Sequence, residues 1–170
     1  WEQPVCIRAS DTANGVIGVT AITSAGGDAT ADNDDGGAAG AITLNTTGTI
    51  ITLNGPISAV GGALSGTGTA GAGGNVTVSD RALLANSTVS ITTGATAGNI
   101  AFSSTLDSEA NEANTLGLTA GTGNITFTGA VGSGTNQELG AVLIVRAANV
   151  TASSTFEAAS LTQTDGTETT

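Results

Sequence analysis

Apolar and small polar residues alternate with a period of two in a hexapeptide that recurs along the second half of the chain. Its apolar positions are mostly β-branched or aromatic, which is typical of half-buried strands and not of helices. Its asparagines, Asn75, Asn99, Asn124 and Asn149, are spaced by 24, 25 and 25 residues. We expect the residue after each asparagine to face inward in one column, formed by Val76, Ile100, Ile125 and Val150.

A second strand signal lies about halfway between successive copies, in residues 89–92, 116–119 and 142–145. The segments between the strands are rich in Gly, Ser and Asn, which is turn chemistry. A unit of about 25 residues cannot bury its apolar stripe alone, so equivalent strands of neighbouring units must stack. The pattern predicts an all-β fold, a parallel β-solenoid with coils of about 24–25 residues. A β-sandwich is the alternative, although its hairpins require no fixed repeat length.

The N-terminal part of the chain, residues 1–73, is less regular than the rest. Residues 15–20 and 40–45 look like degenerate copies of the repeated strand, and residues 26–37 predict a protruding acidic loop. Residues 61–75 predict a second excursion because Leu64 is their only large apolar side chain. We therefore divide the chain into irregular N-terminal coils at 1–73 and regular β-solenoid repeats at 74–170.

Charge and composition narrow the function classes. Lys plus Arg number 3 against 14 for Asp plus Glu, and the formal net charge of -11 repels nucleic acid and anionic lipid surfaces. No run approaches the 18 or more apolar residues of a membrane span. The sequence has no His and no Tyr, so its serines have no imidazole base beside them. Composition thus favours a structural role over an enzymatic one.

The phrase LTAGTGNITFTGAVG at residues 118–132 and the stretch from Leu139 to Gln163 resemble the repeats of very large bacterial surface proteins. These proteins are related to the filamentous haemagglutinins and the autotransporter adhesins. The resemblance covers residues 74–170 well and 1–73 poorly. It implies a secreted right-handed parallel β-helix, a stalk or fibre with an adhesive or structural surface at the bacterial cell surface. Its partners would be like coils or subunits stacked end to end, and a carbohydrate or host surface; it carries over no site residues.

Four carboxylates in eight residues form the candidate metal site, for Ca²⁺: Asp28, Asp32, Asp34 and Asp35. Calcium takes six to eight oxygen ligands from flexible loops of this kind. The spacing matches neither an EF-hand nor the glycine-rich nonapeptide of calcium-binding β-rolls. A solvated acidic loop without a metal is the alternative, and the sequence indicates no other cofactor.

Two further patterns suggest chemistry. Asp107, Glu109 and Glu112 form a second acidic run, and paired carboxylates at a suitable separation cleave glycosidic bonds. The outward positions of the hexapeptide predict two hydroxyl-rich columns that resemble the faces of β-solenoid ice-binding proteins, through Thr77/Ser79, Ala101/Ser103, Thr126/Thr128 and Thr151/Ser153. Any solvated solenoid face would show the same regular hydroxyls, so a plain structural face is the alternative.

Other polar features have ordinary structural explanations. Several asparagines satisfy the glycosylation pattern, but three of these arise from the repeat itself and indicate strand-start chemistry. Cys6, the single cysteine, is either a buried inert residue or a bridge between chains.

The repeat arithmetic also predicts the end of the segment. The position after Asn149 would fall near residue 174, and residues 161–170 look like an ordinary turn and not a cap. Open strands of an uncapped solenoid template association. We therefore expect the native object to continue, as one longer polypeptide, also suggested by the absence of Met, or as stacked subunits.

Overall fold

The computed structural model describes residues 5–9 and 16–169. The described residues form fifteen β-strands and no helix, and every strand pair among them is parallel. In this part of the chain there is accordingly no helix long and apolar enough to cross a membrane. The prediction of an all-β fold built from parallel strands is confirmed.

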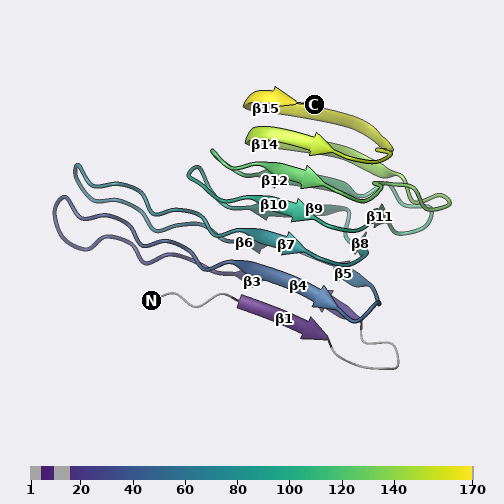
Figure 1. The fold of residues 1–170 in the computed structure, drawn as a ribbon, viewed down its shortest axis with the longest axis horizontal. Coiled ribbons are helices and arrows are strands. Elements are labelled where there is room, and N and C mark those ends of the chain that lie inside the picture. Colours follow the sequence, from purple (N-terminus) through teal and green to yellow (C-terminus); the bar gives the residue numbers. More distant parts are fainter. Residues whose placement is uncertain (1–4, 10–15, 170) are drawn as a thin grey trace.

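The strands are arranged in three rows, which the chain visits in the same order at each pass (Figure 1). Row one contains β1 (Val5–Ala9), β4 (Ile42–Thr46), β7 (Val76–Val78), β10 (Ile100–Phe102), β13 (Ile125–Phe127) and the end of β14 (Leu139–Ala152). Row two contains β2 (Ile17–Val19), β5 (Ile51–Leu53), β8 (Ala82–Leu84) and β11 (Leu106–Ser108). Row three contains β3 (Ile22–Thr23), β6 (Ile57–Ser58), β9 (Thr88–Thr92), β12 (Thr115–Thr119), the start of β14 and the start of β15 (Ala158–Thr169), whose end extends row one.

The predicted internal column is present in row one. Ile100 pairs with Val76 on one side and with Ile125 on the other, and Ile125 pairs with Val150. All four side chains are buried. The regular spacing of the asparagines in the sequence is therefore the strand register of the fold.

Asparagines form a ladder in row one. Each of them immediately precedes the inward residue of the column, at Val76, Ile100, Ile125 and Val150. The carboxamide oxygens of Asn75 and Asn99 accept the backbone N–H of Asn99 and Asn124 respectively, both at 2.8 Å. The Asn149 side chain donates to Asn124 Oδ1 at 3.0 Å. Each of these passes is thus held to the next by a polar bond in addition to the strand ladder.

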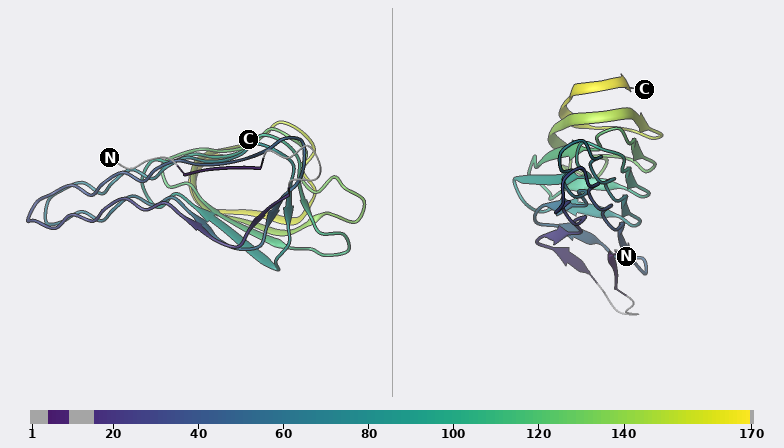
Figure 2. Two further views of the ribbon diagram at one scale, coloured as in Figure 1. Left: turned by 90° about the horizontal axis from the view of Figure 1, so that it is seen from below. Right: turned by 90° about the vertical axis from the view of Figure 1, so that its left-hand side faces the viewer.

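The second strand signal of each repeat forms row three. Val89 pairs with Leu116, and Leu116 pairs with Val142. The long strand β14 turns from row three into row one and joins both rows into a single eleven-stranded sheet. This sheet is strongly curled in the view along the stack (Figure 2), and row two forms a separate four-stranded sheet.

Inward side chains from the three rows share one apolar core. Phe102 and Phe127 stack within it with ring centroids 5.3 Å apart and planes 4° apart. The next position of this column is Ala152, which leaves space beside Phe127. Phe156 fills that space from the following corner, with its ring at 80° to Phe127 and the centroids 5.3 Å apart.

The interpretation of residues 15–20 as an early copy of the hexapeptide is wrong. Ile17 pairs with Ile51 in row two, whereas the partner of Ile42 in row one is Val5. Both segments alternate apolar and small residues, so periodicity alone does not distinguish strands of different rows. The copy at residues 40–45 does lie in row one, where Ile42 pairs with Val76.

Two of the expectations for the end of the segment, the turn at residues 161–170 and the next repeat position near residue 174, are also wrong. Residues 161–169 belong to strand β15 and are not a turn. The register partner of Asn149 is Glu168 and not a position near 174. The reason is that β15 runs on beside β14 from row three into row one, so this pass has no separate loop at that corner.

The first two passes, from Val5 to Ile42 and from Ile42 to Val76, are longer than the later ones because each includes an excursion from the stack. We name residues 26–37 and 60–72 together the glycine fin; the two excursions project side by side, to the left in Figure 1. Successive hydrogen bonds between them are three residues apart: Gly26 and Ala29 donate to the carbonyls of Val60 and Ala63. This spacing is typical of polyproline II segments, which have three residues per turn.

Glycine is required inside the fin because the backbones touch. The backbone N–H of Gly37 donates to the carbonyl of Gly27, that of Gly62 to the carbonyl of Gly37, and that of Gly71 to the carbonyl of Gly62. The outgoing and returning segments of both excursions are therefore hydrogen-bonded to one another. A Cβ atom on Gly62 would lie 2.0 Å from the Gly27 carbonyl oxygen, which no backbone adjustment of a few tenths of an ångström relieves.

Gly62→Ala should therefore open the fin and leave the three rows folded. We expect faster amide exchange and faster proteolysis within residues 26–37, with little change in the cooperative unfolding of the rows. Gly27→Ala is the matched control, since a Cβ there meets nothing within 4 Å. Equal exchange rates in the two variants would contradict the packing described.

Candidate functional site

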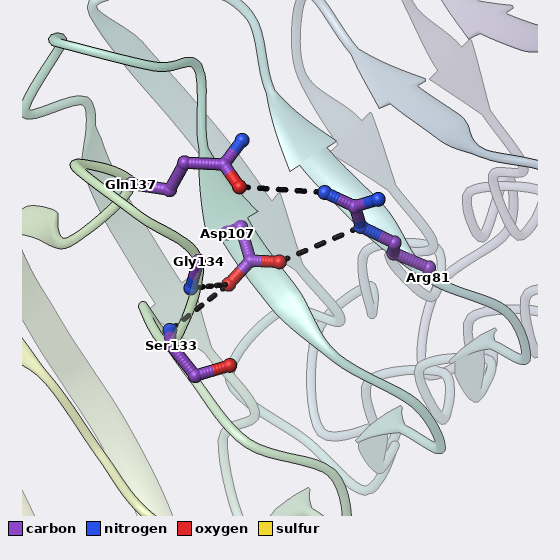
Figure 3. Close-up of polar contacts among 5 residues, drawn as sticks. All are labelled: Arg81, Asp107, Ser133, Gly134 and Gln137. Atoms are coloured by element: carbon purple, nitrogen blue, oxygen red, sulfur yellow. Dashed lines mark hydrogen bonds and ion pairs between the residues drawn. The ribbon is translucent and has the colours of Figure 1, made fainter.

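A buried carboxylate with an arginine beside it lies on the outer side of row two (Figure 3). Asp107 lies in β11 between two inward side chains, so alternation turns it outward. Its side chain is nevertheless only 4% exposed, whereas that of Arg81 is 42% exposed. Arg81 Nε lies 3.5 Å from Asp107 Oδ2.

The loop at residues 132–137 covers this carboxylate. Asp107 Oδ1 accepts the backbone N–H groups of Ser133 at 3.0 Å and Gly134 at 3.3 Å. The loop turns through two residues with positive φ, Gly132 at 67° and Asn136 at 54°. A Cβ atom on Gly134 would meet Gln137 Oε1 at 1.9 Å, so a side chain there would displace the Gln137 carboxamide.

Gln137 completes the cluster by accepting a hydrogen bond from Arg81 Nη2 at 3.4 Å. We name Arg81, Asp107, Ser133, Gly134 and Gln137 the Arg81 cluster. Its members come from three successive passes of the chain, so it fastens the loop across the stack. It also fixes the guanidinium from one side through Nε and Nη2, which sets the direction in which the third nitrogen points.

Asp107→Ala should lower the free energy of unfolding by about 1–3 kcal/mol, because two loop N–H groups lose their buried acceptor. Asp165→Ala is the matched control: Asp165 Oδ2 also lies 3.5 Å from an arginine Nε, that of Arg146, but its side chain is 68% exposed. We expect it to cost less than about 1 kcal/mol. Urea denaturation of both variants measures the difference, and equal losses would refute the clamping role of Asp107.

The second acidic run does not converge on one point. Asp107 faces Arg81 and the loop, whereas Glu112 Oε2 accepts a hydrogen bond from the buried Asn114 side chain at 3.2 Å. No group of three or more Asp, Glu, Cys or His side chains gathers within the described ranges. The hydrolase hypothesis for Asp107, Glu109 and Glu112 therefore gains no geometric support.

The four predicted calcium ligands lie in the first excursion of the fin. Asp28 Oδ1 accepts the Ala63 N–H at 2.7 Å, and Asp35 Oδ1 accepts the Thr69 N–H at 2.6 Å. Between them Asn33 Oδ1, at a residue with φ of 62°, accepts the Thr67 N–H at 3.0 Å. These acceptors hold the second excursion against the first. Calcium binding by Asp28, Asp32, Asp34 and Asp35 stays a hypothesis that titration calorimetry at millimolar calcium would test.

The first of the two predicted outward columns is in register. Across row one, Thr43, Thr77, Ala101, Thr126 and Thr151 lie side by side. The column is interrupted at Ala101, and most of its members are only partly exposed. Ice or polymer binding by this face stays a hypothesis, tested by thermal hysteresis. The side chain of Cys6 lies outside the described residues.

Arg81 and Gln137 were not singled out from the sequence. Their contacts with Asp107 and with each other join distant positions of the chain, which no local motif records. The available signal was the register: Arg81 immediately precedes β8, the row-two strand that pairs with the strand of Asp107.

Comparisons with known proteins add no identification. No protein-family profile matches the chain, and neither the curated proteins nor the solved structures include a significant match.

Proposed function

We propose that the three rows close into a right-handed parallel β-solenoid, and that the chain is a non-enzymatic structural or adhesive segment of a bacterial surface fibre. The observation that carries the proposal is the continuous register of row one, with Val76, Ile100, Ile125 and Val150 paired in sequence and buried. Right-handed crossovers join parallel strands of one sheet in about 98% of cases, which supports the handedness.

Such a fold suits a stalk because its length is set by the number of coils. Each coil adds about 4.8 Å, and its backbone hydrogen bonds run along the axis. The asparagine ladder and the Arg81 cluster add polar bonds between coils. Like coils stacking end to end would extend the rod, while outward side chains remain free to vary for adhesion to a carbohydrate or host surface.

The glycine fin allows the proposed extracellular location of the chain to be tested. An antibody raised against residues 26–37 and used on intact cells of the native organism should label the outside of the cell envelope in immunogold electron microscopy. Protease treatment of intact cells should remove the label. Label that appears only after the cells are permeabilised would reject the extracellular assignment.

A further inference from the structure

A hollow of about 370 Å³ lies beside the Arg81 cluster. The hollow is open to solvent, and its volume is at the lower end of the range of small-ligand pockets. Three of its lining residues stand just before equivalent row-two strands, because Ile17, Ile51 and Ala82 are register partners. The hollow therefore spans three passes of the chain. It is lined by Val16, Gly48, Thr49, Ile50 and Arg81.

Two side chains hold the Arg81 guanidinium on one side. Asp107 and Gln137 engage Nε and Nη2, and Figure 3 shows the remaining nitrogen on the side away from both partners. The Asp107 carboxylate is shared among Arg81 and two loop N–H groups, so it is not committed to the guanidinium alone. Orientation by a buried second partner reduces the entropy that Arg81 would lose on binding an anion.

The other walls combine apolar and backbone surface. Val16 is 57% exposed and Ile50 is partly exposed, so both present aliphatic groups to the hollow. Gly48, with φ of 86°, turns the chain at the rim. A ligand that fits has an anionic group for the guanidinium and a compact apolar face for the aliphatic side chains.

We propose that this hollow binds an organic carboxylate whose carboxyl group is attached to a compact ring or branched aliphatic group, the class that includes uronic acids. A carboxylate matches the planar guanidinium, and the C–H face of a sugar ring matches Val16 and Ile50. The net charge of -11 opposes anions at long range, so we expect weak, millimolar binding. Such binding would be independent of the proposed structural role of the chain.

Titration of the ¹⁵N-labelled chain with glucuronate and isobutyrate, followed by amide chemical shifts, tests this site. We expect saturable shifts at Gly48, Thr49 and Ile50 with both carboxylates and none with glucose. Whichever of glucuronate and isobutyrate has the lower Kd shows whether the hollow prefers a sugar acid or an aliphatic acid. In Arg81→Gln the affinity should fall roughly tenfold or more, because a charge-assisted hydrogen bond is lost.

Arg146→Gln is the matched control, since Arg146 is 44% exposed and also lies 3.5 Å from a carboxylate but does not line the hollow. It should bind like the parent. Val16→Glu is a second variant, which should fold because Val16 is exposed. Its carboxylate should repel the anion and abolish binding. This variant tests the site if Arg81→Gln does not fold. Absence of saturable shifts, or binding retained in the folded variants at Arg81 or Val16, would overturn the proposal.

Discussion

Replacing Ile125 by aspartate is expected to abolish cooperative folding. Ile125 is fully buried and pairs on both sides within row one, with Ile100 and Val150. A carboxylate there would have neither water nor a partner, and the substitution should cost more than about 4 kcal/mol. That loss is comparable to the whole stability of a typical domain. Far-UV circular dichroism and thermal melting of Ile125→Asp measure the effect.

The neighbouring residue provides the control for this prediction. Thr126 lies on the opposite face of the same strand and is partly exposed. Thr126→Asp should cost about 1 kcal/mol or less and keep the parent spectrum. A folded Ile125→Asp, or equal losses in the two variants, would contradict the inward column.

Phe127→Ala is expected to lower the free energy of unfolding by about 3–5 kcal/mol. Phe127 is 1% exposed and contacts a ring on each side, Phe102 and Phe156. The register neighbour of Phe127 in the next pass is Ala152, so row one has no large side chain on that side to fill the cavity. Chemical denaturation of the variant gives the loss directly.

Phe156→Ala should cost distinctly less, because Phe156 is only partly buried and has Phe127 on one side of its ring. Comparing the two losses in the free energy of unfolding shows whether the central position of Phe127 between two rings matters, or whether any phenylalanine of the core contributes equally. If Phe156→Ala were the more damaging of the two, the order of the stack would be wrong.

The repeat made much of the architecture predictable from the sequence. Asn75, Asn99 and Asn124 recur with the strand register, and side-chain bonds link each to the next. The first passes were harder to align because the fin lengthens each of them. Residues 15–20 were assigned to the wrong row since strands of all rows share one alternation.

Long-range polar contacts were less predictable. Asp107 was noticed as part of an acidic run, but its partners come from loops whose positions depend on the packing of separate passes. For the candidate calcium ligands at residues 28–35, the sequence does not reveal that Asp28 and Asp35 accept N–H groups from the second excursion. Glycine content indicated an excursion but not the packing between its segments.

Oxidative cross-linking tests most directly whether equivalent strands stack in three rows. With Cys6 replaced by serine, three pairs of cysteines report one row each. They are placed at register partners: Thr77→Cys with Ala101→Cys in row one, Thr52→Cys with Leu83→Cys in row two, and Ser90→Cys with Gly117→Cys in row three. Register partners have Cα atoms about 4.8 Å apart, within the range that a disulfide spans.

We predict rapid and complete disulfide formation within the monomer for all three pairs. The off-register pair, Thr77→Cys with Ser103→Cys, places the Cα atoms about 8 Å apart and should not close without distortion. Failure of any one of the three register pairs, or equally rapid closure of the off-register pair, would contradict the stacked parallel passes on which the proposed solenoid depends.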